Sequence, residues 1–194
     1  MTIRKIIMTG MLVLVSTSLI AVSGCAAEET TREGYKTYSR YGFSFEYPQS
    51  FLLFEEGLLE SAANDTSGLV YAGVENEEVK YIFVGWLKFS EQLVEFMDLE
   101  TSIEDGLQGI EGGEGIVSVE RGELVETTKA GHRMLYRYYN VTTTEGDRAS
   151  GIFGVWYCDK VQKFYTLYTL NTTISSKGDV LADYQSYLDY FVGH

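Results

Sequence analysis

The chain has 194 residues, and its 28 acidic residues outnumber its 15 basic residues, so the net charge is −13. An acidic surface repels phosphate groups, which argues against nucleic acid as a partner and against direct binding of anionic lipid headgroups by the protein surface. The length fits one domain of ordinary size, with enough apolar residues to form a real core.

The amino terminus has the order of a signal peptide. Arg4 and Lys5 precede an apolar run over residues 6–22, which ends in Val22-Ser23-Gly24-Cys25. These last four residues resemble the lipobox of prokaryotic lipoproteins, in which the cysteine is acylated and becomes the new first residue. We therefore expect residues 1–24 to be removed and Cys25 to carry the lipid. The alternatives are an ordinary secretory signal and an uncleaved membrane helix.

A lipid on Cys25 fixes the expected address of the protein. Acyl chains with about 0.8 kcal/mol per buried methylene anchor a protein stably when two or more are present. The predicted location is the cell envelope, on the extracytoplasmic side of a prokaryotic membrane, with residues 25–34 as a polar tether and residues 35–194 as a single domain. Apart from Cys25 the chain holds only Cys158, so the domain has no internal disulfide.

The first strands of the domain are expected over residues 35–38 and 43–47. The second belongs to an alternating aromatic run that ends at Pro48, the only proline of the chain. Because successive strand side chains point to opposite faces, three rings should enter the core while the residues between them face away. The rings are those of Phe43, Phe45 and Tyr47, and the residues facing away are Gly42, Ser44 and Glu46. Pro48 should end the strand because it has no N–H to donate.

The pattern then predicts an apolar turn, a hairpin and a helix. Residues 51–54 read as the turn, and residues 69–74 and 79–88 as antiparallel strands joined by a polar cluster. After Ser90, a candidate N-cap, apolar residues follow helical spacing to Ile110, where glycines end the helix.

The remaining segments predict consecutive antiparallel strands and a final helix. The strands are expected over residues 116–126, 132–144, 151–158 and 163–170, joined as a meander by short turns. Ser176 and Asp179 have the spacing of a capping box, and an apolar stripe extends from Val180 to Phe191, with Gly193 closing the helix. The predicted class is α+β: a twisted antiparallel β-sheet flanked by helices.

Residues that could carry chemistry are few. His132 and His194 have no cysteine, histidine or acid at ligand spacing along the sequence, so we expect no metal. No nucleophile elbow or cysteine–histidine motif is present, and Cys158, at the end of an apolar strand, is expected to be buried and structural. We therefore predict a protein without catalytic residues or cofactors that is not an enzyme; a hydrolase is the least favoured reading.

One arrangement on residues 132–144 suggests a contact site. Arg133, Arg137 and Tyr139 share one face of the expected strand, where two arginines beside an aromatic ring would clamp a carboxylate or an acidic loop of a partner. The alternative, which we favour, is that the arginines pair with the protein's own glutamates.

Residues 38–48, Tyr-Ser-Arg-Tyr-Gly-Phe-Ser-Phe-Glu-Tyr-Pro, resemble the opening of PsbP-like domains. The order of the later elements also resembles that family, whose α-β-α sandwich is shared by the photosystem II extrinsic protein, Ran-binding relatives, and DcrB-like and LpqN-like lipoproteins. The resemblance covers residues 35–193. The family commonly has a tryptophan shortly after the proline, where this chain has Phe51.

The resemblance implies a non-enzymatic binding or assembly role. Combined with the lipobox, it predicts a membrane-anchored extracytoplasmic lipoprotein that binds another protein or helps to assemble a complex. The alternative is a lipoprotein that binds a small ligand or solute in a pocket between sheet and helix, lined by Trp86, Trp156 and neighbouring tyrosines.

Overall fold

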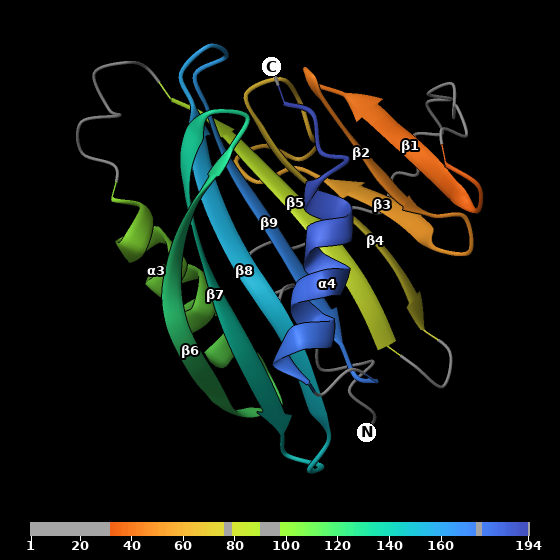
Figure 1. Ribbon diagram of the computed structural model, residues 1–194, viewed down its shortest axis with the longest axis vertical. Coiled ribbons are helices and arrows are strands. Elements are labelled where there is room, and N and C mark those ends of the chain that lie inside the picture. The colour runs from red at the N-terminus through yellow and green to blue at the C-terminus, as the bar shows by residue number, and fades with distance from the viewer. Residues whose placement is uncertain (1–31, 76–78, 90–97, 174–175, 194) are drawn as a thin grey trace.

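The computed structural model describes residues 32–75, 79–89, 98–173 and 176–193. Within these ranges the chain forms a seven-stranded sheet, a separate two-stranded hairpin and two helices, labelled α3 and α4 (Figure 1). None of these helices is long and apolar enough to cross a bilayer. The expected signal peptide, Cys25 and Ser90 lie outside the described residues.

All neighbouring strands are antiparallel, and the sheet order is β3-β4-β5-β9-β8-β7-β6. The strands are β1 (Tyr35–Arg40), β2 (Phe43–Pro48), β3 (Leu52–Glu56), β4 (Ser67–Glu75), β5 (Val79–Lys88), β6 (Ile116–Lys129), β7 (His132–Thr143), β8 (Arg148–Cys158) and β9 (Lys163–Asn171). The helices are α3 (Leu99–Glu111) and α4 (Lys177–Leu188). The predicted hairpin and the predicted meander are both confirmed, and the antiparallel sheet with two helices agrees with the α+β class, although strands dominate.

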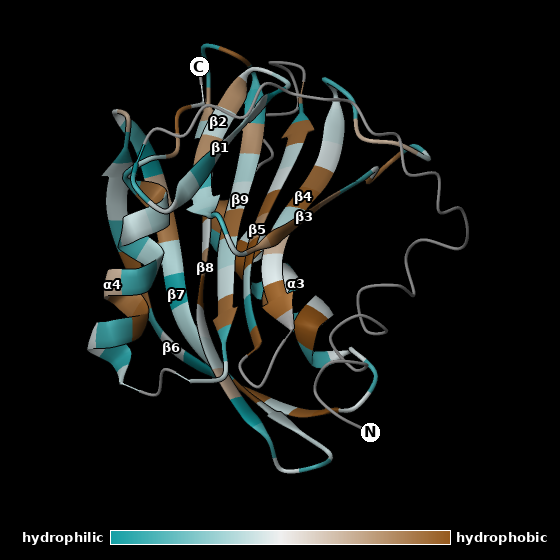
Figure 2. Ribbon diagram, turned by 90° about the vertical axis from the view of Figure 1, so that its right-hand side faces the viewer, coloured by the Kyte–Doolittle hydropathy of each residue, from teal (hydrophilic) through white to brown (hydrophobic). Residues whose placement is uncertain are grey.

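The two helices cover opposite faces of the sheet. α3 packs on β6, β7 and β8, whereas α4 packs on β8, β9 and the hairpin strand β2, so the sheet lies between them (Figure 2). The central strands are apolar in both parities because both of their faces are covered. On β8, for example, Phe153 and Val155 belong to the core cluster under α3, and Ile152 and Trp156 to the cluster under α4.

The aromatic run of β2 is placed as predicted. Phe43, Phe45 and Tyr47 are at most 4% exposed, and Pro48 is the last residue of the strand. Glu46 is a correction, because it does not face solvent: it is buried and its Oε2 lies 3.2 Å from Nε of Arg32. A buried carboxylate is costly without a partner of opposite charge, and Arg32 is that partner.

The prediction of a turn over residues 51–54 is wrong. Residues 52–56 form β3, which pairs with residues 69–73 of β4 and makes one edge of the sheet. A half-buried strand is predicted from alternating apolar and polar residues. This segment lacks that alternation because Leu52 and Phe54 are apolar although they are exposed.

The helix boundaries also differ from the expected ones. α3 begins at Leu99, because Asp98 is extended and its side chain accepts a hydrogen bond from the Glu100 N–H. The expected single helix therefore does not continue through Asp98, and residues 90–97 lie outside the described residues. α4 begins as predicted, with the Asp179 N–H donating to Ser176 Oγ at 3.2 Å, but it ends at Leu188. Phe191 lies beyond it in a segment where Val192 bridges to Ser44 of β2.

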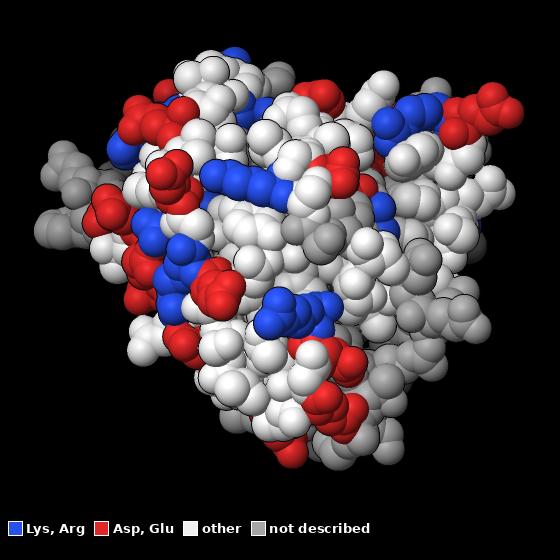
Figure 3. Space-filling view, turned by 60° about the horizontal axis from the view of Figure 1, so that its bottom comes forward, with Lys and Arg blue, Asp and Glu red and all other residues white. Residues whose placement is uncertain are grey.

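Charges of both signs lie side by side on one face of the molecule. In Figure 3, Lys and Arg side chains lie beside Asp and Glu side chains across the visible face. Despite the net charge of −13, this face therefore presents no large field of one sign, and a partner docking on it would meet both donors and acceptors.

Candidate functional site

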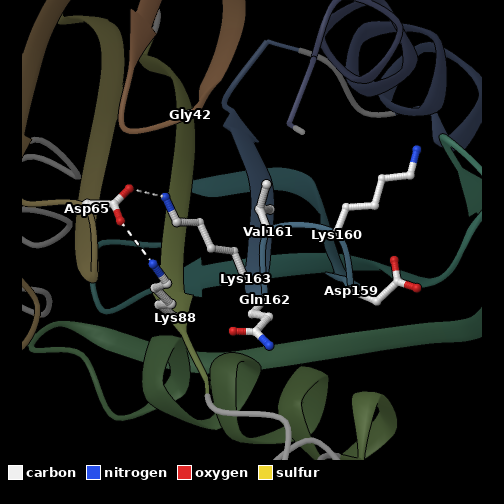
Figure 4. A pocket seen from close by; sticks show the side chains of 8 residues that line it. All are labelled: Gly42, Asp65, Lys88, Asp159, Lys160, Val161, Gln162 and Lys163. Atoms are coloured by element: carbon white, nitrogen blue, oxygen red, sulfur yellow. Dashed lines mark hydrogen bonds and ion pairs between the residues drawn. The ribbon is translucent and has the colours of Figure 1, made fainter.

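An open pocket of about 450 Å³ lies beside the turn that joins β8 to β9 (Figure 4). One side is the turn itself, and the other is formed by Gly42 of the β1–β2 turn, by Asp65, which precedes β4, and by Lys88, the last residue of β5. The lining residues are Gly42, Asp65, Lys88, Asp159, Lys160, Val161, Gln162 and Lys163. Three of them are lysines, which is a notable concentration of positive charge in an acidic chain.

Lys163 is the buried centre of this pocket. It is 3% exposed, and its Nζ donates to Asp65 Oδ1 at 2.7 Å and to the Tyr41 carbonyl at 2.5 Å. Lys88 lies on the other oxygen of the same carboxylate, with Nζ 3.2 Å from Oδ2. The hydrogen bond from Lys163, followed by that from Lys88, holds the pKa of Asp65 below its ordinary range. A carboxylate shared by two lysines leaves net positive charge at the wall.

The β1–β2 turn provides one wall of the pocket. Tyr41 and Gly42 both have positive φ, 51° and 75°, which is the geometry of a tight two-residue hairpin turn. The turn directs the Tyr41 carbonyl at Lys163, while the Tyr41 ring stacks on Trp86 with 5.1 Å between centroids. The opening motif of the domain therefore forms part of a surface site as well as part of the core.

The predicted contact residues on β7 have partners within the chain. Arg133 Nη2 lies 3.0 Å from a Glu126 carboxylate oxygen, and Arg137 Nη1 lies 3.1 Å from one of Glu104. Tyr139 is buried in the cluster under α3, and its hydroxyl donates to the Thr169 carbonyl at 2.7 Å. The predicted pairing of the arginines with the protein's own glutamates is therefore present, and the contact of Arg133, Arg137 and Tyr139 with a partner stays a prediction.

A second group of chemical side chains lies at the end of the β7–β8 pair. His132, Cys158 and Asp159 each bring one ligand-type atom within 4.8 Å of the other two. Sequence reasoning did not find this group because His132 and Cys158 are far apart in the chain. Only the register of the two strands brings them together, and that register was not evident from the connecting turn.

The edge strand β3 carries exposed apolar residues. Leu52 and Phe54 are 68% and 44% exposed, and Leu58 and Leu59, in the loop that follows, are also exposed. We call these four residues the β3 edge surface. Phe54 is the outer end of an aromatic row across the sheet, stacked on Tyr71 at 5.1 Å. β3 pairs with β4 on one side, and no described strand pairs with its other edge.

The two tryptophans of the ligand-binding alternative are core residues. Trp86 is 1% exposed and donates its indole N–H to the Asn64 carbonyl at 2.8 Å. Trp156 is 2% exposed and stacks on Tyr165 with 5.4 Å between centroids. Neither lines the 450 Å³ pocket.

Comparison with solved structures decides the fold. No protein-family profile matches the chain, and no curated protein matches its sequence. The solution structure of cyanobacterial PsbP (CyanoP) from Synechocystis sp. PCC 6803 superimposes with a TM-score of 0.60 at 12% identity, covering 89% of this chain and 99% of that one. The fold is PsbP-like.

This likeness confirms the fold predicted from the opening motif and the element order. The crystal structure of the Ran-binding protein Mog1p of Saccharomyces cerevisiae superimposes less well. Its TM-score is 0.47 at 11% identity, covering 81% of this chain and 94% of that one. At these identities the likeness concerns the fold alone.

Proposed function

We propose that this chain is a membrane-anchored extracytoplasmic lipoprotein whose PsbP-like domain binds another protein, without catalysis, and so helps to assemble or maintain an envelope complex. The observation that carries the proposal is the β3 edge surface. The lipobox at residues 22–25 supplies the anchor, and the sequence holds no catalytic motif.

The β3 edge surface has the two features of a docking strand. An edge strand offers unpaired backbone N–H and C=O groups, to which a segment of a partner adds as a further strand. Leu52 and Phe54 lie on that same strand and are 68% and 44% exposed. Grouped exposed apolar residues mark interaction surfaces, because their burial against a partner contributes about 25 cal/mol per Å².

Crosslinking in intact host cells tests this proposal. We expect a photoreactive residue at Leu59 to recover a discrete protein partner from the wild-type chain. Leu52→Glu and Phe54→Glu should reduce that recovery at least about tenfold, since a charge must then be desolvated at the contact. The matched control is Val117→Glu, which alters an exposed apolar residue on β6, the opposite edge strand.

Two outcomes would contradict the proposal. Recovery of nothing above the level of a probe-free control would remove the protein-binding role. If Leu52→Glu and Phe54→Glu recover as much partner as the control Val117→Glu, the contact lies elsewhere than on β3. Because these residues are exposed, the substitutions should change the free energy of unfolding by only about 0.5 kcal/mol, so the variants remain folded.

A second candidate function is the binding of a small anionic ligand in the lysine pocket. The pocket volume, about 450 Å³, lies within the range of about 300–1,000 Å³ seen for ligand sites. Lys160 lies at the rim of the pocket, apart from the two lysines that contact Asp65 (Figure 4). A panel of small carboxylates and phosphates should then raise the Tm of the wild-type chain but not of Lys160→Gln. A panel without effect on the wild type removes this candidate.

A further inference from the structure

The end of the β7–β8 pair brings three metal-binding side chains to one place. Met134 of β7 lies opposite Trp156 of β8, and continuing this antiparallel register by two residues sets His132 opposite Cys158. Both residues have the parity of Met134 and Trp156, which belong to the core cluster under α4. Asp159 follows Cys158 at the start of the turn.

The distances within this group fit a metal ion. All three ligand atoms lie within 4.8 Å of one another, and His132 Nδ1 is 3.4 Å from Asp159 Oδ1. In a tetrahedral zinc site, bonds of about 2.0–2.3 Å separate the ligand atoms by about 3.3–3.6 Å. The His132–Asp159 distance already fits, so any adjustment concerns the distances to the sulfur of the buried Cys158. Asp159, whose side chain is 77% exposed, has room to turn toward that sulfur.

The donor set selects the metal. A thiolate, an imidazole and a carboxylate are the ligands of zinc and related divalent transition metals, whereas calcium and magnesium require oxygen ligands. We propose that His132, Cys158 and Asp159 bind one divalent ion of the zinc class, with the fourth coordination position open to solvent beside the turn. This proposal is independent of the β3 edge surface.

The surroundings supply two polar groups that lack partners. Within the described ranges, Nε2 of His132 and the hydroxyl of Tyr165 are buried and have no hydrogen-bond partner. Tyr165 is close enough to Cys158 to interact with it electrostatically. Cys158 is itself fully buried, so the sulfur side of the site is dry and the Asp159 side is wet.

Cobalt titration tests the site directly. The purified full-length chain, treated with a chelator and dialysed, is titrated with Co²⁺ and followed by absorption. We expect one equivalent to bind with a sulfur-to-cobalt charge-transfer band in the near ultraviolet, and Zn²⁺ to displace it. Cys158→Ser should abolish the band, and His132→Gln and Asp159→Asn should each weaken binding by more than about 100-fold, beyond the roughly 10–100-fold expected for the loss of an outer contact.

The controls separate metal binding from loss of fold. Asp147→Asn changes an exposed acid in the β7–β8 turn, at the other end of the same hairpin, and should bind like the wild type. Asp159→Asn changes an exposed side chain, so its circular dichroism spectrum should be unchanged even if Cys158→Ser proves unstable. A wild-type chain without the band, or a band that survives in Cys158→Ser, overturns the proposal, as does wild-type affinity in both Asp159→Asn and His132→Gln.

Discussion

Phe45 lies at the centre of the ring cluster that joins the β1–β2 hairpin to the main core. It is 1% exposed, and its ring centroid lies 5.4 Å from that of Tyr38 and 6.0 Å from that of Tyr47. Phe45→Ala should lower the free energy of unfolding by about 3–5 kcal/mol, because it removes a buried ring and leaves a cavity. Denaturant unfolding measures the effect. The prediction is contradicted if Phe45→Ala lowers the free energy of unfolding no more than Phe54→Ala, which changes a residue at the exposed sheet edge.

Asp65 and Lys163 make stability depend on pH. The pKa of Asp65 is lower in the folded protein than in the unfolded chain, chiefly through the hydrogen bond from Lys163. The ionised carboxylate therefore stabilises the fold at pH values above its pKa in the unfolded chain, about 3.9. This stability is lost as the pH falls through its lower pKa in the folded protein. We therefore expect Asp65→Asn to be less stable than the wild type at pH 7, and the difference to shrink at pH 2–3. A difference that stays constant between these pH values would argue against the pairing.

At the scale of elements, α3 approaches the sheet through a glycine. A Cβ on Gly106 would lie 2.3 Å from Cζ of Phe153, whereas one on Gly109 would meet no atom within 4 Å. Gly106→Ala should therefore destabilise the protein by about 1–3 kcal/mol through overpacking. Gly109→Ala should stabilise it by about 0.5–1 kcal/mol, because alanine loses less backbone entropy in a helix. Thermal unfolding of the two variants checks the prediction, and a shift of the same sign in both would contradict it.

Most elements could be predicted because their patterns are local. The alternation of Phe43, Phe45 and Tyr47 and the serine–aspartate cap of α4 each need only a few neighbouring residues. β3 was missed because its outer side chains are exposed and its pairing with β4 is not local. The end of α4 was missed because Phe191 continues the apolar stripe although the helix has already ended; its ring stacks on Phe43 instead.

The candidate sites depended on contacts that no local pattern contains. The lysine pocket joins residues 42, 65, 88 and 159–163, and the His132–Cys158 pair requires the register of β7 and β8. The three residues named in advance, Arg133, Arg137 and Tyr139, were correctly placed on one face by strand alternation. Sequence could not reveal that Glu104 of α3 would lie beside Arg137.

At the scale of the whole molecule, the location of the protein should depend on Cys25, which lies outside the described residues. If Cys25 carries the lipid, Cys25→Ser should move the protein from the membrane fraction to the soluble fraction, because the acidic surface has no affinity for anionic headgroups. Fractionation of host cells with immunodetection measures this shift. Unchanged membrane association of Cys25→Ser would point to the uncleaved-helix alternative.

The pairing of β5 with β9 determines when the domain can complete its fold. Residues 80–88 pair with residues 163–171, and Val192, which follows α4, bridges to Ser44 in β2. During synthesis the inner edge of β5 therefore has no neighbour until β9 has been made, and such non-local pairing forms slowly. If the chain is exported, as we propose, it has to pass through the membrane before it folds, and this topology postpones closure of the sheet until its last strands arrive.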